Sequence, residues 1–251
     1  MPIAGKTYLV TGANRGLGRG LVERYLARPS STVVAAVRSL ERLSSKSLVE
    51  LPKGTNSTLI VVKIDSTSQT DALEAISKLK TEHSITHLDV VIANAGICKA
   101  YPSVDKATIA EMTEHFSVNS LGALLLFQAV VPLLRQAEET PKFVTMSSAV
   151  GSIGDMEATP VPHLAYGASK AALNFITRKM HFEHPEIIIF PVDPGWVQTE
   201  LGDNAAVTFG FGEADITIKD CLDSLVKTID KATKKKSSGN FMHYKIGEVP
   251  W

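Results

Sequence analysis

Thr11-Gly12-Ala13-Asn14-Arg15-Gly16-Leu17-Gly18 is the stretch that decides the fold, because it follows a short apolar run and a helical pattern starts within it. Glycines at this spacing permit a tight turn and let backbone N–H groups at the positive end of a helix approach a pyrophosphate. An ordinary strand-to-helix turn can contain the same glycines, but the position after the first strand favours a dinucleotide site. The candidate cofactor-binding residues in it are Gly12, Asn14, Arg15, Gly16, Leu17 and Gly18.

Strand-like and helix-like patterns alternate along the rest of the chain. Short apolar runs rich in β-branched residues predict seven strands, at residues 7–10, 32–37, 58–64, 88–93, 143–146, 187–192 and 240–244. Between the first two, Leu17, Leu21 and Tyr25 share one helical face. Because the runs are apolar throughout, each strand should be buried on both faces. The sequence therefore predicts an α/β fold with a doubly wound, mostly parallel seven-stranded sheet and helices on both faces, the Rossmann type.

The chain is expected to form one domain, residues 1–251. No internal repeat and no linker rich in Pro, Gly or Ser divides it. Two segments, at about 151–164 and 200–215, interrupt the alternation and are predicted to be long loops at the substrate site. The second contains Phe209 and Phe211 among three glycines, so we expect it to close over the substrate as a mobile lid rather than act as a structural staple.

Composition argues against several classes of partner. The 251 residues include 26 Lys and Arg against 26 Asp and Glu, so no overall field attracts nucleic acid or an anionic membrane. The longest apolar stretch, 121–134, falls short of the ~20 residues of a membrane span, and no apolar leader precedes the first strand. Cys98 and Cys221 lie far apart and are expected to be reduced thiols. We therefore expect a cytoplasmic protein with neither nucleic-acid nor membrane partners.

Two arginines indicate which dinucleotide binds. Sites for NAD usually place an acidic residue at the end of the second strand to hold the ribose 2′-hydroxyl. Here no acidic residue stands at the end of the second strand, where Arg38 follows residue 37, and Arg15 lies in the glycine-rich stretch. A planar, always-charged guanidinium suits a 2′-phosphate, and two solvated surface arginines are the alternative interpretation. The sequence therefore predicts NADPH/NADP+ as the cofactor.

Tyr166 and Lys170 are the candidates for proton transfer. They lie at i and i+4 in a stretch with a helical pattern, so their side chains share one face. At ~5 Å and an effective dielectric of ~20, attraction between a phenolate and the ammonium is roughly 3 kcal/mol, which would lower the pKa of Tyr166 by about two units. The tyrosine would then serve as a general acid or base near neutral pH.

Other polar residues are predicted to meet this pair at the carboxyl edge of the sheet. Ser147 and Ser148 follow the fifth strand, and Asn119 interrupts a long helical stretch in which an amide is a poor helix former. The fourth strand ends in Asn94-Ala95-Gly96, and the sixth ends in Asp193-Pro194-Gly195-Trp196-Val197-Gln198-Thr199. All of these positions would lie on one rim.

These motifs resemble the short-chain dehydrogenase/reductase family, and the resemblance covers essentially the whole chain. It implies that Tyr166 is the proton donor and that Lys170 holds the nicotinamide ribose while lowering the tyrosine pKa. Ser148 would polarise the substrate carbonyl; it is preferred to Ser147 because the family's serine usually precedes a two-residue step to glycine, here Gly151. Asn119 would anchor a water that links Lys170 to solvent. The remaining residues that the resemblance places at the cofactor are Asp65, near the adenine, Thr199, at the carboxamide, and Asn94, Ala95, Gly96, Pro194, Gly195 and Val197.

Within this family, the sequence is most similar to fungal norsolorinic acid ketoreductases and their relatives in secondary metabolism. The stretches that carry this similarity are 86–91, 165–171, 193–199, 238–241 and 249–251. The implied activity is NADPH-dependent reduction of a hydrophobic, polyketide-like ketone, with a small-molecule ketone or alcohol as the partner. A cofactor-assisted isomerase, dehydratase or cyclase and an inactive binding or scaffold protein are the alternatives. A homodimer and a homotetramer both stay open.

No metal site is predicted. His181 and His184 lie close in helical register, but no carboxylate or cysteine at ligand spacing joins them. Cys98, just after Asn94-Ala95-Gly96, either lines the pocket or fills the core as a small hydrophobic residue.

Overall fold

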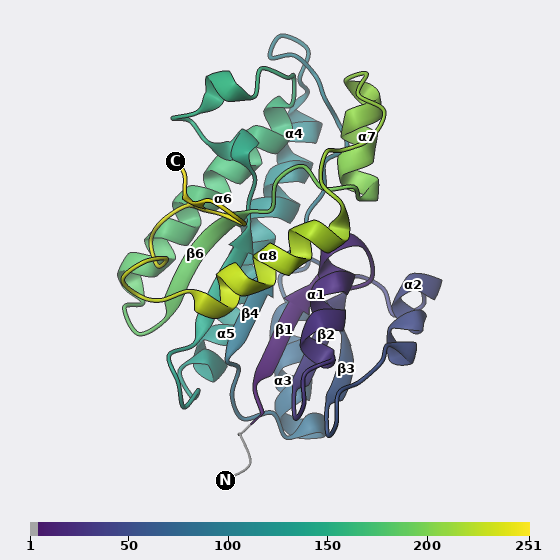
Figure 1. The fold of residues 1–251 in the computed structure, drawn as a ribbon, viewed down its shortest axis with the longest axis vertical. Helices are drawn as coiled ribbons and strands as arrows, with labels where there is room; N and C mark the ends of the chain where they lie inside the picture. The colour runs from purple at the N-terminus through teal and green to yellow at the C-terminus, as the bar shows by residue number, and fades with distance from the viewer. Residues whose placement is uncertain (1–4) are drawn as a thin grey trace.

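A computed structural model describes residues 5–251 of the chain (Figure 1). The expectation that no leader precedes the first strand concerns residues 1–4, which lie outside the described residues. Eight strands form one sheet in the order β3-β2-β1-β4-β5-β6-β7-β8. The strands are β1 Thr7–Thr11, β2 Thr32–Val37, β3 Thr58–Lys63, β4 Val90–Ala93, β5 Lys142–Met146, β6 Ile188–Asp193, β7 Met242–His243 and β8 Gly247–Glu248.

The sheet is parallel from β3 to β7, and β8 pairs antiparallel with β7. The strand order reverses at β1, which pairs with β2 on one side and with β4 on the other. The prediction of a doubly wound, mostly parallel sheet is confirmed, but the predicted strand count of seven is wrong. The eighth strand has only two residues and no apolar run, so no periodicity marked it.

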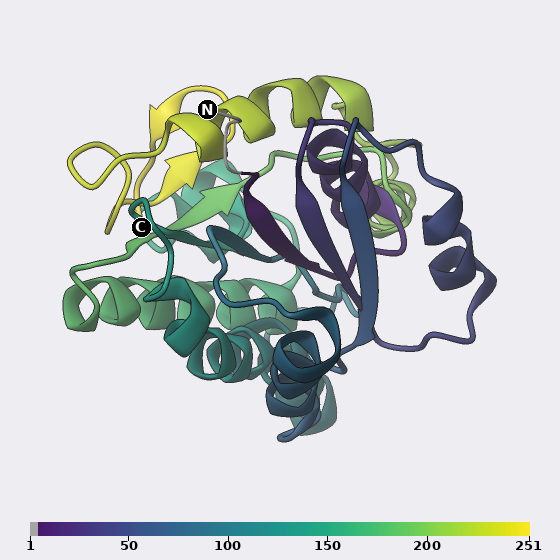
Figure 2. The ribbon, with the colours of Figure 1, turned by 90° about the horizontal axis from the view of Figure 1, so that it is seen from below.

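Helices cover both faces of the sheet, as Figure 2 shows. The apolar faces of α1 and α8 pack on one side, and those of α3, α5 and α6 pack on the other. The helices are α1 Gly16–Leu26, α2 Leu43–Lys46, α3 Asp71–His83, α4 Ile109–Phe116, α5 Gly122–Leu134, α6 Leu164–Glu183, α7 Glu200–Thr208 and α8 Ile218–Lys231.

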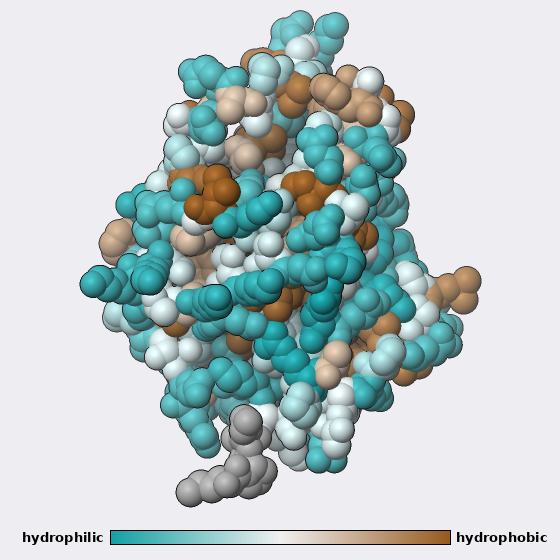
Figure 3. Space-filling view, viewed as in Figure 1, coloured by the Kyte–Doolittle hydropathy of each residue, from teal (hydrophilic) through white to brown (hydrophobic). Residues whose placement is uncertain are grey.

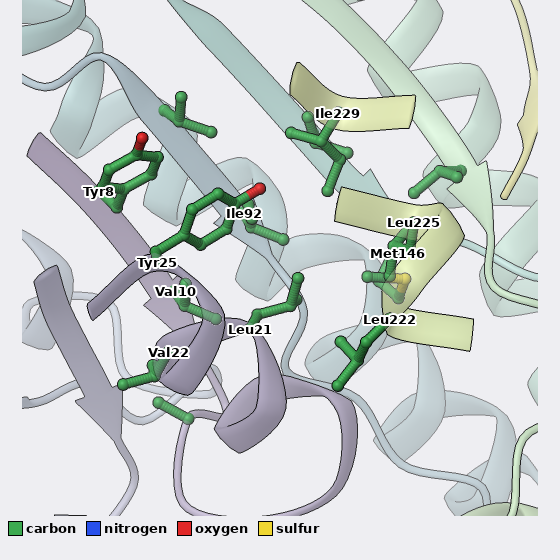
Figure 4. Packing of buried hydrophobic residues seen from close by; sticks show 14 of the residues in the cluster. Tyr8, Val10, Leu21, Val22, Tyr25, Ile92, Met146, Leu222, Leu225 and Ile229 are labelled. Carbon is green, nitrogen blue, oxygen red and sulfur yellow. The ribbon is translucent and has the colours of Figure 1, made fainter. Parts of the chain in front are cut away.

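Aromatic and aliphatic side chains fill the layer between the sheet and the α1 and α8 helices (Figure 4). Tyr25 of α1 stacks on Tyr8 of β1 with ring centroids 4.2 Å apart. Leu222 and Leu225 of α8 are buried in the same cluster. Burial of each such side chain stabilises the fold by roughly 1.5–3 kcal/mol, so this layer fixes α1 firmly against the end of β1.

One long apolar helical run belongs to the opposite layer. It joins α4, a π-helical turn at Ser117–Leu121 and α5, and it is longer than the apolar stretch singled out in the sequence. By length and composition alone the run Ile109–Leu134 is sufficient to cross a membrane, yet half of its most apolar window is buried within the protein. Leu126, Phe127 and Leu134 of α5 pack in the core, which accounts for much of that hydropathy.

The two segments predicted as loops differ in outcome. The segment 151–164 is mostly irregular, with short 3₁₀ turns at Ala149–Gly151 and Met156–Ala158. The prediction for 200–215 is wrong in its first half, which forms α7. Thr199 caps this helix, since its Oγ1 accepts a hydrogen bond from the Gly202 N–H at 3.1 Å. A Cβ at Gly202 would overlap the Val197 carbonyl oxygen, so this glycine permits close packing rather than a hinge.

Gly18 and Gly20 of α1 provide a matched test of how closely this helix packs against its neighbours. A Cβ at Gly18 would overlap the Gly12 carbonyl oxygen and lie 2.6 Å from Asn94 Nδ2, whereas a Cβ at Gly20 would overlap only the movable Cδ1 of Leu222. We expect Gly18→Ala to lower the free energy of unfolding by about 2–3 kcal/mol. Gly20→Ala should stay within about 1 kcal/mol of the parent, because the gain in helix propensity offsets the shift of Leu222. Urea unfolding measures both, and equal losses would contradict this reading of the contacts.

Candidate active site

A cleft of about 1130 Å³ lies at the carboxyl ends of the parallel strands. These ends point toward the upper half of Figure 1, where α4 and α7 lie. In Figure 3, hydrophobic residues gather in the upper part of the same face, whereas the surface over α8 is mainly hydrophilic. Every candidate cofactor-binding residue lines the cleft, as do Ser148 and Tyr166. Asn119 is the exception and is buried behind the wall.

The glycine-rich stretch turns sharply from β1 into the first turn of α1. Gly12 and Gly16 have φ angles of +63° and +52°, a region that favours glycine. Thr11 ties this turn to the end of β4, because its Oγ1 accepts hydrogen bonds from the backbone N–H groups of Asn94 and Ala95 at 3.0 Å. The Asn94 side chain donates to the Thr11 carbonyl at 2.9 Å. Asn94 therefore braces the turn with its side chain.

The start of α1 fits a pyrophosphate. Within the described residues, the Arg15 side chain at the N-cap position makes no capping hydrogen bond, and the first turn contains no acidic residue. The N–H groups of that turn therefore open onto the cleft, and the helix dipole favours an anion there. The chemistry of this end of the cleft agrees with the dinucleotide prediction.

The two arginines lie at the same end of the cleft but in different surroundings. Arg15 forms an ion pair with Glu200 at the start of α7, and both side chains are largely exposed. Arg38 follows β2, is exposed and lines the cleft. Arg38 is thus the more available of the two for a phosphate, whereas Arg15 is shared with a carboxylate.

Tyr166 and Lys170 face each other from successive turns of α6, as predicted. Lys170 Nζ lies 5.4 Å from the centroid of the Tyr166 ring. The ammonium is buried and donates a hydrogen bond to the Met146 carbonyl at the end of β5, at 2.8 Å. This backbone carbonyl at the carboxyl end of β5 compensates in part for removing the charge of Lys170 from water.

The predicted fall in the pKa of Tyr166 is wrong for this structure. Burial raises the pKa of Tyr166 above its ordinary value, the nearby Cys98 thiol adds to the rise, and the Ser148 hydroxyl opposes it. Burial also lowers the pKa of Lys170 to about 8. The sequence argument counted the attraction between phenolate and ammonium but not the desolvation of both groups, which dominates here.

The two predicted serines differ in burial and in their partners. Ser147 is buried, and its hydroxyl donates to Asn174 Oδ1 at 2.5 Å. Ser148 is partly exposed in the cleft, and its hydroxyl opposes the rise in the pKa of Tyr166. Ser148 is therefore the serine available to a substrate, and Ser147 supports the packing of α6.

Asn119 lies in the π-helical turn, which explains why it interrupts the helical stretch. Its Oδ1 accepts from the Ile97 N–H at 2.8 Å, and its Nδ2 donates to the Ile97 carbonyl and to Ser169 Oγ, both at 2.9 Å. A Cβ at Gly96 would lie 3.2 Å from Asn119 Oδ1 and 3.5 Å from Lys170 Nζ. Asn119 thus approaches Lys170 across Gly96, and its role toward a water stays a prediction.

Several residues of the cleft were missed by the sequence analysis. Tyr101 and His163 line it from irregular segments that have no periodicity to mark them. Asp193 was quoted only as part of a motif, yet it is buried, its Oδ1 accepts from the Gly195 N–H at 3.1 Å, and burial raises its pKa. Its position at the end of β6 was the available signal. Cys98 and Phe209 do line the cleft, and residues 5–251 contain no cluster of metal-binding side chains.

Comparison with known proteins identifies the family. Residues 6–208 match the family model for short chain dehydrogenases. The chain belongs to the short-chain dehydrogenase family. This short-chain dehydrogenase is an oxidoreductase, as the resemblance implied.

Its curated relatives include fungal ketoreductases. It is 44% identical to norsolorinic acid ketoreductase nor1 of Dothistroma septosporum, over 98% of this chain and 92% of the relative. It is 40% identical to norsolorinic acid ketoreductase of Aspergillus parasiticus, over 97% of this chain and 90% of the relative.

Solved structures that are similar to this chain include two carbonyl reductases. The NADPH-bound carbonyl reductase from chicken fatty liver is 28% identical, with a TM-score of 0.85 over 99% of this chain and 100% of that chain. Carbonyl reductase Sniffer of D. melanogaster is 26% identical, with a TM-score of 0.84 over 98% of this chain and 100% of that chain.

Because the Lys170 ammonium is buried, we predict that this residue lowers the stability of the folded protein. Its pKa of about 8 lies below the ordinary 10.5, so the unfolded state binds more protons between these values and stability rises with pH across that window. The cost of burying the charge is fully present below about pH 8. We expect Lys170→Met to be more stable than the parent at about pH 7, by on the order of 1–3 kcal/mol, with a smaller gain at about pH 10.

Urea unfolding at both pH values measures this effect. Lys179→Met, on the same helix but in an exposed pair with Glu183, is the control and should change little. If Lys170→Met were less stable than the parent at both pH values, the hydrogen bond to Met146 would outweigh the desolvation of the ammonium.

Proposed function

We propose that this short-chain dehydrogenase is a ketoreductase that uses NADPH to reduce the carbonyl of a hydrophobic, polyketide-like ketone. The observation that carries the proposal is the convergence of Ser148, Tyr166 and Lys170 on the cleft that also contains the glycine-rich turn. Identities of 44% and 40% with norsolorinic acid ketoreductases support the ketone class. The aromatic side chains of Trp196 and Phe209 in the cleft wall support an apolar, ring-containing substrate.

The cofactor is NADP(H). The similar carbonyl reductase from chicken fatty liver is bound to NADPH. In this chain, the first-turn N–H groups of α1 would hold the pyrophosphate, and Arg38 with Arg15 would hold the 2′-phosphate. When bound, NADPH supplies the hydride that reaches the carbonyl carbon.

The protein's own part of the reaction is to hold and donate a proton. The raised pKa of Tyr166 keeps its hydroxyl protonated until the carbonyl oxygen takes up the proton, so the ketone becomes an alcohol and the tyrosine a phenolate. Lys170, cationic below about pH 8, stabilises that phenolate from the next turn of α6. The Ser148 hydroxyl donates a hydrogen bond to the same carbonyl oxygen and orients it.

Three further expectations accompany the proposal and stay predictions. Residues of the segment 200–215 line the cleft, Phe209 and Phe211 among them. Its closure on substrate is the expected motion. The protein is expected in the cytoplasm and as a homodimer or homotetramer.

Tyr166 and the two serines give the direct test of the proton-donating role. We expect Tyr166→Phe to lower kcat roughly 10²–10⁴-fold for an aromatic ketone while the Kd of NADPH is nearly unchanged. Ser148→Ala should also lose turnover. Ser147→Ala is the matched control: it should keep most activity but lose about 1–3 kcal/mol of stability, because Oδ1 of the buried Asn174 loses its hydrogen-bond donor. NADPH absorbance and product mass spectrometry, with equal amounts of NADP+ and alcohol formed, measure the reaction. Parent-level turnover in Tyr166→Phe would exclude Tyr166 as the acid.

The arginines predict the cofactor preference. We expect Arg38→Ala to raise the Kd of NADPH about 10-fold and to leave the Kd of NADH nearly unchanged, since a charge-assisted hydrogen bond of about 1.5 kcal/mol is lost at an exposed position. Arg15→Ala should have a smaller effect, because Glu200 already shares that guanidinium. Fluorescence titration measures the constants, with Arg24→Ala, whose guanidinium pairs with Asp223 on α8, as the control. Unchanged NADPH affinity in Arg38→Ala would remove Arg38 from the cofactor site.

A further inference from the structure

Three buried polar atoms of residues that line the cleft have no hydrogen-bond partner within residues 5–251. One is Ser45 Oγ on α2, and the other two are the Tyr101 hydroxyl and Nε2 of His163, in the same cleft as Tyr166. Buried polar groups in folded proteins are nearly always paired, so an unpaired group in a ligand cleft indicates where a ligand atom binds. Neither Tyr101 nor His163 takes part in the proton transfer described above.

The chemistry of these two atoms defines what they would bind. Burial raises the pKa of Tyr101, so its hydroxyl is a neutral donor. Burial lowers the pKa of His163, so its imidazole is neutral at pH 7, with Nε2 able to accept or donate according to the tautomer. The thiol of Cys98 lies beside the Tyr101 hydroxyl but is a weak partner, which leaves the stronger bonding capacity of the phenol free. The pair suits an uncharged oxygen, such as a phenolic hydroxyl or a second carbonyl.

An aromatic side chain joins the two polar groups. The Phe209 ring, at the C-terminal end of α7, meets the Tyr101 ring edge-on with centroids 5.2 Å apart. It meets the His163 ring in the same manner at 6.3 Å. Three rings from three separate segments therefore form one group at the substrate end of the cleft. Such rings favour a flat aromatic ligand by stacking and edge contacts.

We propose that Tyr101 and His163 are substrate-binding residues that hold an oxygen on the ring system of an aromatic ketone, away from the carbonyl that is reduced, with Phe209 against the ring. The inference rests on the proposed ketoreductase function and narrows its substrate to oxygenated aromatic ketones. The oxygenated ligand is preferred because a ring without an oxygen substituent leaves the Tyr101 hydroxyl and Nε2 of His163 unpaired.

The experiment compares α-tetralone with its singly hydroxylated ring derivatives as ligands and substrates. For the parent, the best hydroxylated derivative is expected to have a kcat/KM at least about 10-fold above that of α-tetralone. Tyr101→Phe and His163→Phe keep a ring but remove the polar atom, and each should reduce this ratio roughly 3- to 10-fold. The reduction should come from the hydroxylated ketone, with the values for α-tetralone nearly unchanged.

Tyr25→Phe is the matched control, because its hydroxyl is also buried and unpaired in the described chain but lies in the core outside the cleft. This variant should leave the ratio at the parent value. Quenching of tryptophan fluorescence, with Trp196 in the cleft wall, gives the Kd of each ketone for the NADP+-loaded protein independently of turnover.

The outcomes separate the two claims. Binding that shows the hydroxyl preference and its loss in both variants, without any NADPH oxidation, would support this inference and contradict the reductase proposal. Reduction of the plain and hydroxylated ketones with equal kcat/KM would overturn this inference and leave the reductase proposal standing. A ratio unchanged in Tyr101→Phe and His163→Phe would overturn it as well.

Discussion

The close approach of helix α1 to the end of β1 is the constraint on which the rest of the structure depends. Only a hydrogen atom fits at Gly18 against the Gly12 carbonyl, and hydrogen bonds between Thr11 and the end of β4 lock the turn in place. This contact lies where the strand order reverses, so the segments that follow β1 and β4 leave toward opposite faces of the sheet and a ligand can enter between them. The anion site, the cleft and the position of β4 all follow from it.

A second constraint is the buried charge of Lys170. The protein meets it with a backbone carbonyl from β5, and the carboxylate of Asp193 acts on it electrostatically without forming a direct ion pair. A partner carboxylate would stabilise the ammonium more strongly but would also fix it as a cation in a closed pair. The observed arrangement keeps the pKa of Lys170 near neutral pH. It lowers the stability of the folded protein, and packing of the apolar core offsets that loss.

Properties that a short stretch of sequence encodes could be predicted, whereas properties that depend on burial or on side-chain direction in the folded protein could not. Apolar runs predicted seven strands because strands buried on both faces need them, whereas β8 has two residues and no such run. Glycines suggested a loop at 200–215, although Thr199 followed by Glu200 and Asp203 carried the signature of a helix start, and α7 forms there. Spacing placed Tyr166 beside Lys170, but the direction of the tyrosine pKa depends on burial, which no spacing encodes. The roles of Ser147 and Ser148 likewise depend on which way each side chain points.

Helix α6 contains Tyr166, the proposed proton donor, and has His163, one of the two proposed substrate-binding residues, at its start. His163 stands at its N-cap and Tyr166 lies three residues later, a rise of about 4.5 Å along one rigid axis. The backbone spacing of the two residues is therefore set by the start of a single helix. If both side chains bind ligand oxygen atoms as proposed, this spacing favours ligands whose two oxygen atoms are a matching distance apart, and so selects which carbonyl of a multiply oxygenated molecule is reduced.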